Sequence, residues 1–375
     1  MQAEQARWSE DGPEPRPALR NAQLVLVFGS RERLESRGLF EKLRAAYPQA
    51  RIVGASTAGE IAGLDVLDGS LVTTAIRFAS TRVGAVGVRL DEVAGSREAG
   101  EFLARSLPRE DLTHVLVFAD GTQVNGTELV RGLRNELPPH VQVTGGLAGD
   151  GERFESTLVL ADAPPAPATI SAVGLYGSRV HVSYGSLGGW DPFGPSRVIT
   201  RSQGNVVHEI DGRPALDLYK EILGDKAAGL PATGLLFPLL VRTAPVDFVR
   251  TLLGVDEKRR ALIFAGDVPQ GERVNFMRAN FERLIQGAEG AALDARASVE
   301  GPQVALLISC VGRKMVLKER TQDEVAAVQK VLGEAILAGF YSYGEICPVA
   351  RDANCTLHNQ TMTITVIAEA AAPTV

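Results

Sequence analysis

Three stretches of the chain share one order of apolar and polar positions. Residues 24–28 form a continuous apolar run that ends at Gly29-Ser30, and residues 31–47 then place apolar side chains at near-helical spacing. A continuous apolar run is typical of a strand buried on both faces, and a spacing of three and four residues is typical of an amphipathic helix. The order therefore predicts a strand, a helix and a second strand that leads into a glycine turn.

Each of the three stretches ends in a glycine followed by an acid. Gly54 to Ile61 shares the frame G-x4-GEI with Gly339 to Ile346. A further copy ends at Gly149-Asp150, which lies as far from Phe118 as Gly59 lies from Phe28. Duplication is the simplest source of such a repeat. Because turns of this kind expose backbone N–H groups, the sequence predicts three related units that present similar turns to a ligand.

Shorter apolar and alternating runs add further strands to these units. We expect strands at residues 71–78, 83–90, 172–176, 179–184, 197–201, 206–210, 246–253, 261–265, 272–276 and 361–368, with 172–176 and 179–184 joined as a hairpin around Gly177-Ser178. Strands that alternate with helices imply a partly parallel sheet. The predicted fold class is α/β, with two related domains built from duplicated strand-helix-strand units and added antiparallel strands. The predicted parts are a disordered tail at 1–20, an amino-terminal domain at 21–225 and a carboxyl-terminal domain at 226–370.

Composition narrows the class of protein. The 375 residues are 45% apolar, which is enough for a sizeable core, and the net charge of −6 comes with no massed Lys or Arg, so nucleic acid is not an expected partner. No apolar run approaches the ~18 residues that a membrane span requires. The first residues resemble no signal peptide, and three cysteines suit a reducing compartment. We therefore expect a cytoplasmic protein that contacts neither nucleic acid nor membrane.

Several motifs in order resemble the FIST family, in which a FIST amino-terminal domain precedes a FIST carboxyl-terminal domain. The motifs are residues 54–61, 144–150, 209–216, 309–313, 339–346 and 358–361. The resemblance implies a sensor of small ligands in signal transduction. It also implies regulation of a histidine kinase or a cyclic-di-GMP enzyme in trans, with a homodimer as one arrangement, because members are often fused to or encoded with such enzymes. One stand-alone subgroup of the family binds haem b and senses nitric oxide.

The duplicated turns predict the ligand site. Equivalent strand ends are the usual place for ligands in α/β proteins, so we expect a cleft walled by the two G-x4-GEI turns, by residues 310–313 and by an aromatic Gly-Pro loop at residues 185–196. The expected ligand-binding residues are Gly54, Ser56, Thr57, Gly59, Glu60, Trp190, Cys310, Arg313, Tyr341, Tyr343, Gly344 and Glu345. The aromatic loop could equally cover the core, and the two glutamates could be structural.

Haem, if bound, needs an axial ligand, and imidazole is the commonest. Because the chain has no C-x-x-C-H motif, binding would be non-covalent. The candidate metal ligands are His181, His358 and His208, with Tyr341, Tyr343 or Cys347 as substitutes. The alternative is a haem-free sensor of a small organic ligand such as an amino acid.

A catalytic role has less support in the sequence. Cys310 precedes Gly312-Arg313, where a nearby cation and backbone N–H groups would lower the pKa of the thiol and make it a nucleophile. Arg313 also suits a ligand carboxylate or a haem propionate. Since no triad, metal cluster or catalytic carboxylate pair is evident, we expect no enzymatic activity, with a cysteine-dependent enzyme as the remaining alternative.

Overall fold

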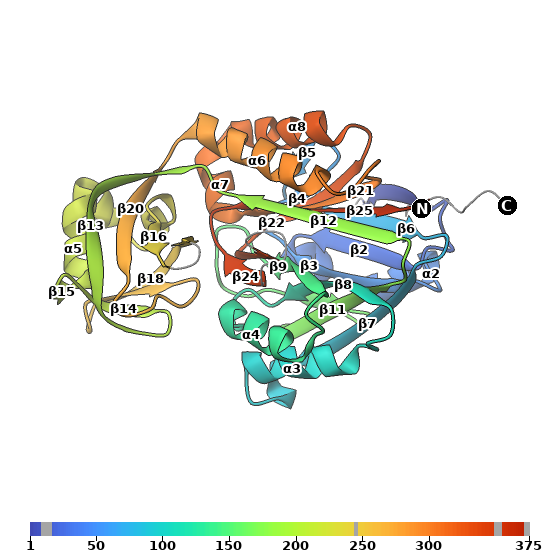
Figure 1. The fold of residues 1–375 in the computed structure, drawn as a ribbon, viewed down its shortest axis with the longest axis horizontal. Helices are drawn as coiled ribbons and strands as arrows, with labels where there is room; N and C mark the ends of the chain where they lie inside the picture. The colour runs from blue at the N-terminus through green and yellow to red at the C-terminus, as the bar shows by residue number, and fades with distance from the viewer. Residues whose placement is uncertain (9–16, 244–246, 349–354, 371–375) are drawn as a thin grey trace.

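The computed structural model describes residues 1–8, 17–243, 247–348 and 355–370, and has two lobes (Figure 1). The larger lobe holds three sheets with helices on the outside, and the smaller lobe holds residues 190–279. The predicted α/β class, with duplicated strand-helix-strand units and added antiparallel strands, is confirmed. No helix within the described ranges is long and apolar enough to cross a membrane.

The larger lobe consists of three repeats. Each contains a parallel pair of strands joined through a helical crossover, namely β2/β3, β8/β9 and β21/β22. The first repeat comprises β1 (Gln2–Arg7), β2 (Leu24–Gly29), α1 (Arg31–Leu34), α2 (Leu39–Ala46), β3 (Arg51–Ser56), β4 (Glu60–Ala62), β5 (Asp65–Leu67) and β6 (Leu71–Arg77). The second comprises β7 (Arg82–Arg89), α3 (Ser96–Ser106), β8 (Leu112–Ala119), α4 (Gly126–Glu136), β9 (Gln142–Leu147), β10 (Val159–Ala161) and β11 (Thr169–Tyr176). The third comprises β12 (Val180–Leu187), α6 (Phe281–Arg296), β21 (Val304–Cys310), α7 (Val311–Leu317), α8 (Thr321–Leu332), β22 (Ile336–Ser342), β23 (Gly344–Pro348), β24 (Cys355–His358) and β25 (Met362–Glu369).

The repeats are linked by a cyclic exchange of strands. The strand orders are β1-β6-β2-β3-β10, β24-β23-β9-β8-β11-β7 and β12-β25-β21-β22-β4-β5. Thus β4 of the first repeat pairs with β22 of the third, β23 of the third pairs with β9 of the second, and β10 of the second pairs with β3 of the first. Because every repeat completes the sheet of another, the three depend on one another for stability.

The three sheets meet at a common apolar core. Phe28, Phe118 and Phe340 gather there, with ring centroids 4.7 to 6.3 Å apart. Phe28 and Phe118 occupy equivalent positions on β2 and β8, whereas Phe340 lies on β22 beside Ile308. Helices cover the outer faces, and Ser30 and Asn125 cap two of them by accepting the backbone N–H three residues later.

The third repeat carries the smaller lobe as an insertion between β12 and α6, here called the insertion lobe. Its strands and α-helix are β13 (Trp190–Gln203), β14 (Val206–Ile210), β15 (Arg213–Pro214), α5 (Ala215–Leu223), β16 (Leu239–Arg242), β17 (Phe248–Arg250), β18 (Leu252–Asp256), β19 (Ala261–Phe264) and β20 (Arg273–Ala279). They form one eight-stranded sheet with its own core. The domain boundary near residue 225 stays a prediction, and strands from both sides of it contribute to this sheet.

Three expectations about local structure were wrong. Residues 2–7 are not part of a disordered tail, because they form the edge strand β1, which pairs with β6, and the Met1 ammonium lies 3.4 Å from the Glu369 carboxylate. The tail at 9–16 and the strand residue 246 lie outside the described residues. The hairpin around Gly177-Ser178 does not form, since β11 and β12 belong to different sheets and this is where the chain passes between repeats. Most of the expected loop at 185–196 is strand, in β12 and β13.

Candidate functional site

The carboxyl ends of the parallel strands bring the three glycine-acid turns to one end of the larger lobe. The turns of the first and third repeats are hydrogen-bonded neighbours, since Ala58 N–H donates to Tyr341 O and Tyr341 N–H donates to Gly59 O, both at 2.8 Å. The turn of the second repeat joins them because Gly149 N–H donates to Ser56 O, also at 2.8 Å. The turns of the first and third repeats therefore meet, as the sequence predicted, and the turn of the second repeat joins them without having been among the expected cleft walls.

Glu60 and Glu345 are held in the same way, each by two hydroxyl groups. Thr57 donates its hydroxyl to one oxygen of Glu60, and Ser70 donates its N–H and hydroxyl to the other at 3.1 and 2.6 Å. Ser342 donates to one oxygen of Glu345 at 2.8 Å, and Thr361 donates its N–H and hydroxyl to the other at 3.2 and 2.9 Å. Both carboxyl groups are buried. Each set of hydrogen bonds to the two carboxyl oxygens is here called a clasp. The two clasps support the interpretation that the paired glutamates have a structural role.

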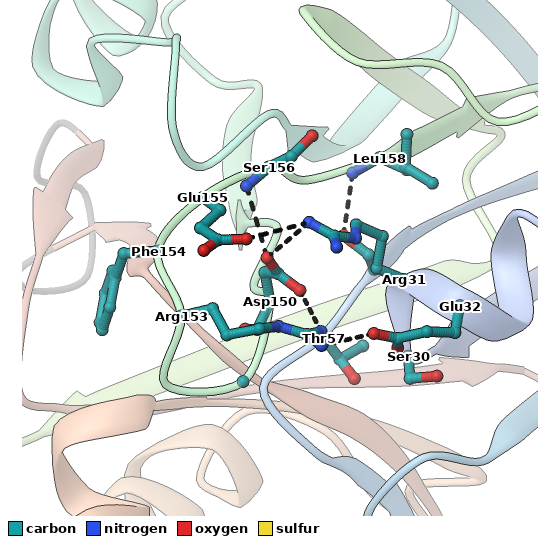
Figure 2. A network of polar contacts seen from close by, with 12 residues as sticks. Ser30, Arg31, Glu32, Thr57, Asp150, Arg153, Phe154, Glu155, Ser156 and Leu158 are labelled. Carbon is teal, nitrogen blue, oxygen red and sulfur yellow. Dashed lines mark hydrogen bonds and ion pairs between the residues drawn. The ribbon is translucent and has the colours of Figure 1, made fainter.

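The third acid, Asp150, is held by arginines instead (Figure 2). Its side chain is fully buried, one oxygen lies 3.1 Å from Arg31 Nη1, and the other is paired with Arg153. Arg153 also pairs with Glu32, whose side chain is half exposed. The buried Asp150 carboxylate thus fixes a guanidinium whose other end reaches a solvent-exposed position.

A cavity of about 360 Å³ lies beside this network. It lies between the turn of the first repeat and the segment that follows Asp150 in the second. The lining residues are Ser30, Glu32, Thr57, Ala58, Gly59, Glu60, Asp68, Gly69, Gly151, Glu152 and Arg153. At the rim of the cavity Asp68 forms an ion pair with Lys314, whose ammonium also donates to Ala58 O at 2.9 Å. The cavity therefore combines carboxylates, one guanidinium and backbone polar groups.

Burial favours the neutral form of the clasped glutamates. It raises the pKa of Glu345 to about 8 and also raises the pKa of Glu60, although the donated hydrogen bonds act in the opposite direction. Glu345 therefore holds its proton near neutral pH and adds no charge to the interior.

This pKa predicts a pH-dependent effect of Glu345→Gln. Unfolded glutamate titrates near 4.5, so the wild-type protein loses stability as pH rises from 4.5 to about 8, where only the native state keeps the proton. We expect the free energy of unfolding of the variant, relative to wild type, to increase between pH 5 and pH 8.5 in urea titrations. Glu369→Gln is the control, because five hydrogen bonds hold the pKa of Glu369 at about 2, below that range. A difference independent of pH for Glu345→Gln would contradict the assignment.

Of the twelve expected ligand-binding residues, only Thr57, Gly59 and Glu60 line the cavity. Gly54 and Ser56 are buried in β3, and Gly344 is buried at the start of β23. Trp190 is 5% exposed and packs between the lobes, where its indole N–H donates to Gln360 O at 3.1 Å. The expected single cleft walled by both turns is not seen among the described cavities, because the third-repeat turn lines none of them.

Arg313 cannot receive a ligand carboxylate, because its guanidinium is already bound. It lies fully buried, forms an ion pair with Glu324 at 2.8 Å, and donates to the carbonyl oxygens of Gly188 and Leu284. Tyr341 donates to the same Glu324 carboxylate at 2.7 Å. Tyr343 stacks on Phe154 with ring centroids 4.2 Å apart. These contacts stabilise the fold, and no local pattern indicated that Glu324 would neutralise Arg313.

The alternative of a cysteine-dependent enzyme is not supported at Cys310. Cys310 is 2% exposed, and burial raises the pKa of its thiol well above the ordinary value. The backbone N–H groups of Gly312 and Gln360 and the Arg313 charge lower the pKa, as the sequence suggested, but desolvation is the larger effect.

The three candidate haem ligands lie on different sheets. His181 is exposed on β12, His208 lies on β14 of the insertion lobe, and His358 lies on β24. Nε2 of His358 is 2.9 Å from Cys347 O, and burial lowers the pKa of this imidazole to about 4. None of the three lines a described cavity, and no group of three His, Cys, Asp or Glu side chains in the described residues could hold a metal. The three histidines thus do not converge on one described cavity, and haem binding remains a prediction.

The sequence missed Arg153, Glu32 and Ser70. Arg153 lies three residues after the acid of the second repeat, where the other repeats have no arginine. That departure from the repeat was a usable signal. No local sequence pattern indicates the contact between Arg153 and Glu32, because the two residues belong to different repeats.

Comparison with known proteins gives the family. A FIST N domain model matches residues 23–213, and a FIST C domain model matches residues 215–348. An uncharacterized protein of Mycobacterium tuberculosis is 28% identical over 352 residues, 87% of each chain. An uncharacterized protein of Methanocaldococcus jannaschii is 22% identical over 382 residues, 92% of this chain and 73% of the other.

The expectation of no enzymatic activity is corrected, because the structural comparison finds an enzyme. A cyanuric acid hydrolase from A. caulinodans covers 99% of both chains at a TM-score of 0.38 and 9% identity. A likeness this distant carries no argument about catalysis by this chain. Since the two family models together span nearly the whole of the described fold, the chain belongs to the FIST family of sensory, ligand-binding proteins.

Proposed function

We propose that the protein is a sensor that binds a small zwitterion, such as an amino acid, in the cavity beside Asp150. The observation that carries the proposal is the Arg153–Glu32 pair on the cavity wall. A guanidinium binds a carboxylate in two-point geometry, and a carboxylate binds an ammonium group. The wall thus presents one partner for each charge of a zwitterion.

The pair can be opened at little cost. The side chains of Arg153 and Glu32 are 43% and 53% exposed, and exposed ion pairs contribute only about 0–1 kcal/mol. Arg153 would keep its position because its second nitrogen stays paired with the buried Asp150. A ligand could therefore replace a weak contact without displacing the anchored one.

Arg153→Gln tests the proposal. We expect one of the common amino acids to raise the melting temperature of the wild-type protein, and the variant to bind that amino acid at least about tenfold more weakly, the loss of one charge-assisted hydrogen bond. Isothermal titration measures the affinities. Arg97→Gln is the control, since Arg97 forms a comparably exposed pair with Glu128 away from the cavity. The proposal fails if no amino acid binds the wild type, or if Arg153→Gln binds as tightly as Arg97→Gln.

The output partner is proposed from the family alone. The FIST resemblance supports a histidine kinase or a cyclic-di-GMP enzyme that responds to occupancy of the sensor. For the ligand, the charged cavity favours a small organic molecule over haem and nitric oxide, because the candidate histidines lie elsewhere.

A further inference from the structure

The strand register identifies equivalent positions in the three repeats. Leu71, Ile170 and Met362 are the first residues of β6, β11 and β25 that pair with β2, β8 and β21, at matching places. The residues just before them, 68–70, 167–169 and 359–361, are here called the closing turns. In each closing turn the carbonyl oxygen of the third residue accepts an equivalent backbone hydrogen bond. The donors are the N–H groups of Ser30, Asp120 and Cys310, at 3.0, 2.9 and 3.0 Å respectively. The middle residues all have positive φ, at 66°, 53° and 65° for Gly69, Ala168 and Gln360.

This register places a counterpart of the first-repeat cavity in the third repeat. The cavity-lining residues Ser30, Thr57, Glu60, Asp68 and Gly69 correspond to Cys310, Ser342, Glu345, Asn359 and Gln360. The clasp around Glu345 repeats the clasp around Glu60, which confirms the correspondence at the level of side chains.

The two places differ in what covers them. In the first repeat Asp68 is 75% exposed and the cavity is open. In the third repeat the insertion lobe lies over the closing turn, where Gln360 Nε2 donates to Leu235 O at 2.9 Å and Trp190 Nε1 donates to Gln360 O at 3.1 Å. Asn359 and Gln360 are consequently only 1% and 0% exposed.

Under this cover three side-chain atoms of the closing turn lack partners. Within the described part of the chain, Asn359 Oδ1, Asn359 Nδ2 and Gln360 Oε1 are buried without a hydrogen bond. Leaving a buried polar group without a hydrogen bond is costly, and three such atoms on adjacent residues of one turn point to a missing partner. Gln360 also has a positive φ, which residues other than glycine rarely adopt.

We propose that Asn359 and Gln360, with Cys310 and Glu345 below them, form a second binding site for a small uncharged ligand that carries an amide. The free atoms of Asn359 are one acceptor and one adjacent donor, and an amide with N–H and C=O on one edge satisfies both at once. Gln360 Oε1 accepts a further N–H. A charged ligand does not suit the site, because Glu345 is protonated near neutral pH and Arg313 is neutralised by Glu324.

The site is distinct from the proposed zwitterion site in chemistry and in place. Occupancy here would tie the closing turn to the insertion lobe, since Gln360 already bonds to Leu235 and Trp190. None of the residues that line the first-repeat cavity belongs to that lobe. The protein would thus carry one open site and one covered site built on the same repeat.

Two matched probes test the proposal on the full-length protein. 2-Pyrrolidinone offers an adjacent donor and acceptor, and N-methyl-2-pyrrolidinone offers the acceptor alone. We expect the first to bind at least about tenfold more tightly, the equivalent of one hydrogen bond, and to shift the side-chain amide resonances of Asn359 in a ¹⁵N-labelled sample. Asn359→Leu should abolish this preference, whereas Asn135→Leu, the same change at an exposed position, should keep it.

Three outcomes would overturn the proposal. They are equal affinity for the two probes, unchanged binding by Asn359→Leu, or no binding together with a crystal structure in which ordered water alone bonds to Asn359. If Asn359→Leu does not fold, the comparison of the two probes on the wild-type protein still decides. Arg153→Gln should bind 2-pyrrolidinone as the wild type does, so failure of this site and failure of the zwitterion site are separable.

Discussion

Gly54→Ala is expected to cost more than about 4 kcal/mol of stability or to prevent folding, the range of severe core overpacking. A methyl group at Gly54 would lie 1.8 Å from the carbonyl oxygen of Val27 on the paired strand, and that oxygen belongs to rigid backbone. The register places Gly145 and Gly339 at the same point of the other two repeats, where the methyl group would lie 1.9 Å from Val117 O and 1.8 Å from Leu307 O. We therefore expect all three alanine variants to fail alike.

Soluble yield and urea denaturation measure this effect, and Gly254→Ala is the matched control. Gly254 also lies in a strand, β18, but its nearest neighbour would be Ile263 Cδ1 at 3.7 Å, an ordinary contact. We expect its stability to stay within about 0.5 kcal/mol of wild type. Near-normal stability of Gly54→Ala would mean that the parallel strands are further apart than the structure shows.

Arg313→Met is expected to destabilise the protein by about 3–5 kcal/mol, because it leaves a charge buried without its partner. Glu324 has no exposed side-chain surface, and its remaining donors are the hydroxyls of Tyr341 and Ser309 at 2.7 and 3.2 Å. The carbonyl oxygens of Gly188 and Leu284 would lose the hydrogen bonds from Arg313 as well. The contact with Gly188 also ties the insertion lobe's connection to α7.

Arg320→Met is the control for this result. Arg320 pairs with Glu282 and Asp323 on the surface, where an ion pair contributes about 0–1 kcal/mol. Urea denaturation of both variants gives the comparison, and the double variant Arg313→Met/Glu324→Gln should recover part of the loss because it removes the unpaired charge. If Arg313→Met were as stable as Arg320→Met, the buried Arg313–Glu324 pair would not be what holds α7, α8 and the segment at Gly188 together.

The sequence by itself determined the repeated unit. Residues 24–28, with apolar side chains throughout, specify a strand buried on both faces, and the glycine-acid turns of Gly59-Glu60 and Gly344-Glu345 follow from a local pattern that needs no partner. Duplication made this signal readable, because the same spacing recurs wherever the same unit folds. The family resemblance rested on the same motifs and was confirmed by matches to both domain models.

Only the tertiary structure decided which side chains are free to act. In the sequence Arg313 has the features of a ligand-binding arginine, but in the fold it is paired with the buried Glu324. Cys310 has the features of a reactive thiol, but burial raises its pKa. Arg153 became a site residue only when the exchange of strands brought the second repeat against Glu32 of the first. Desolvation and pairing depend on residues far away in sequence, so local spacing carries no record of them.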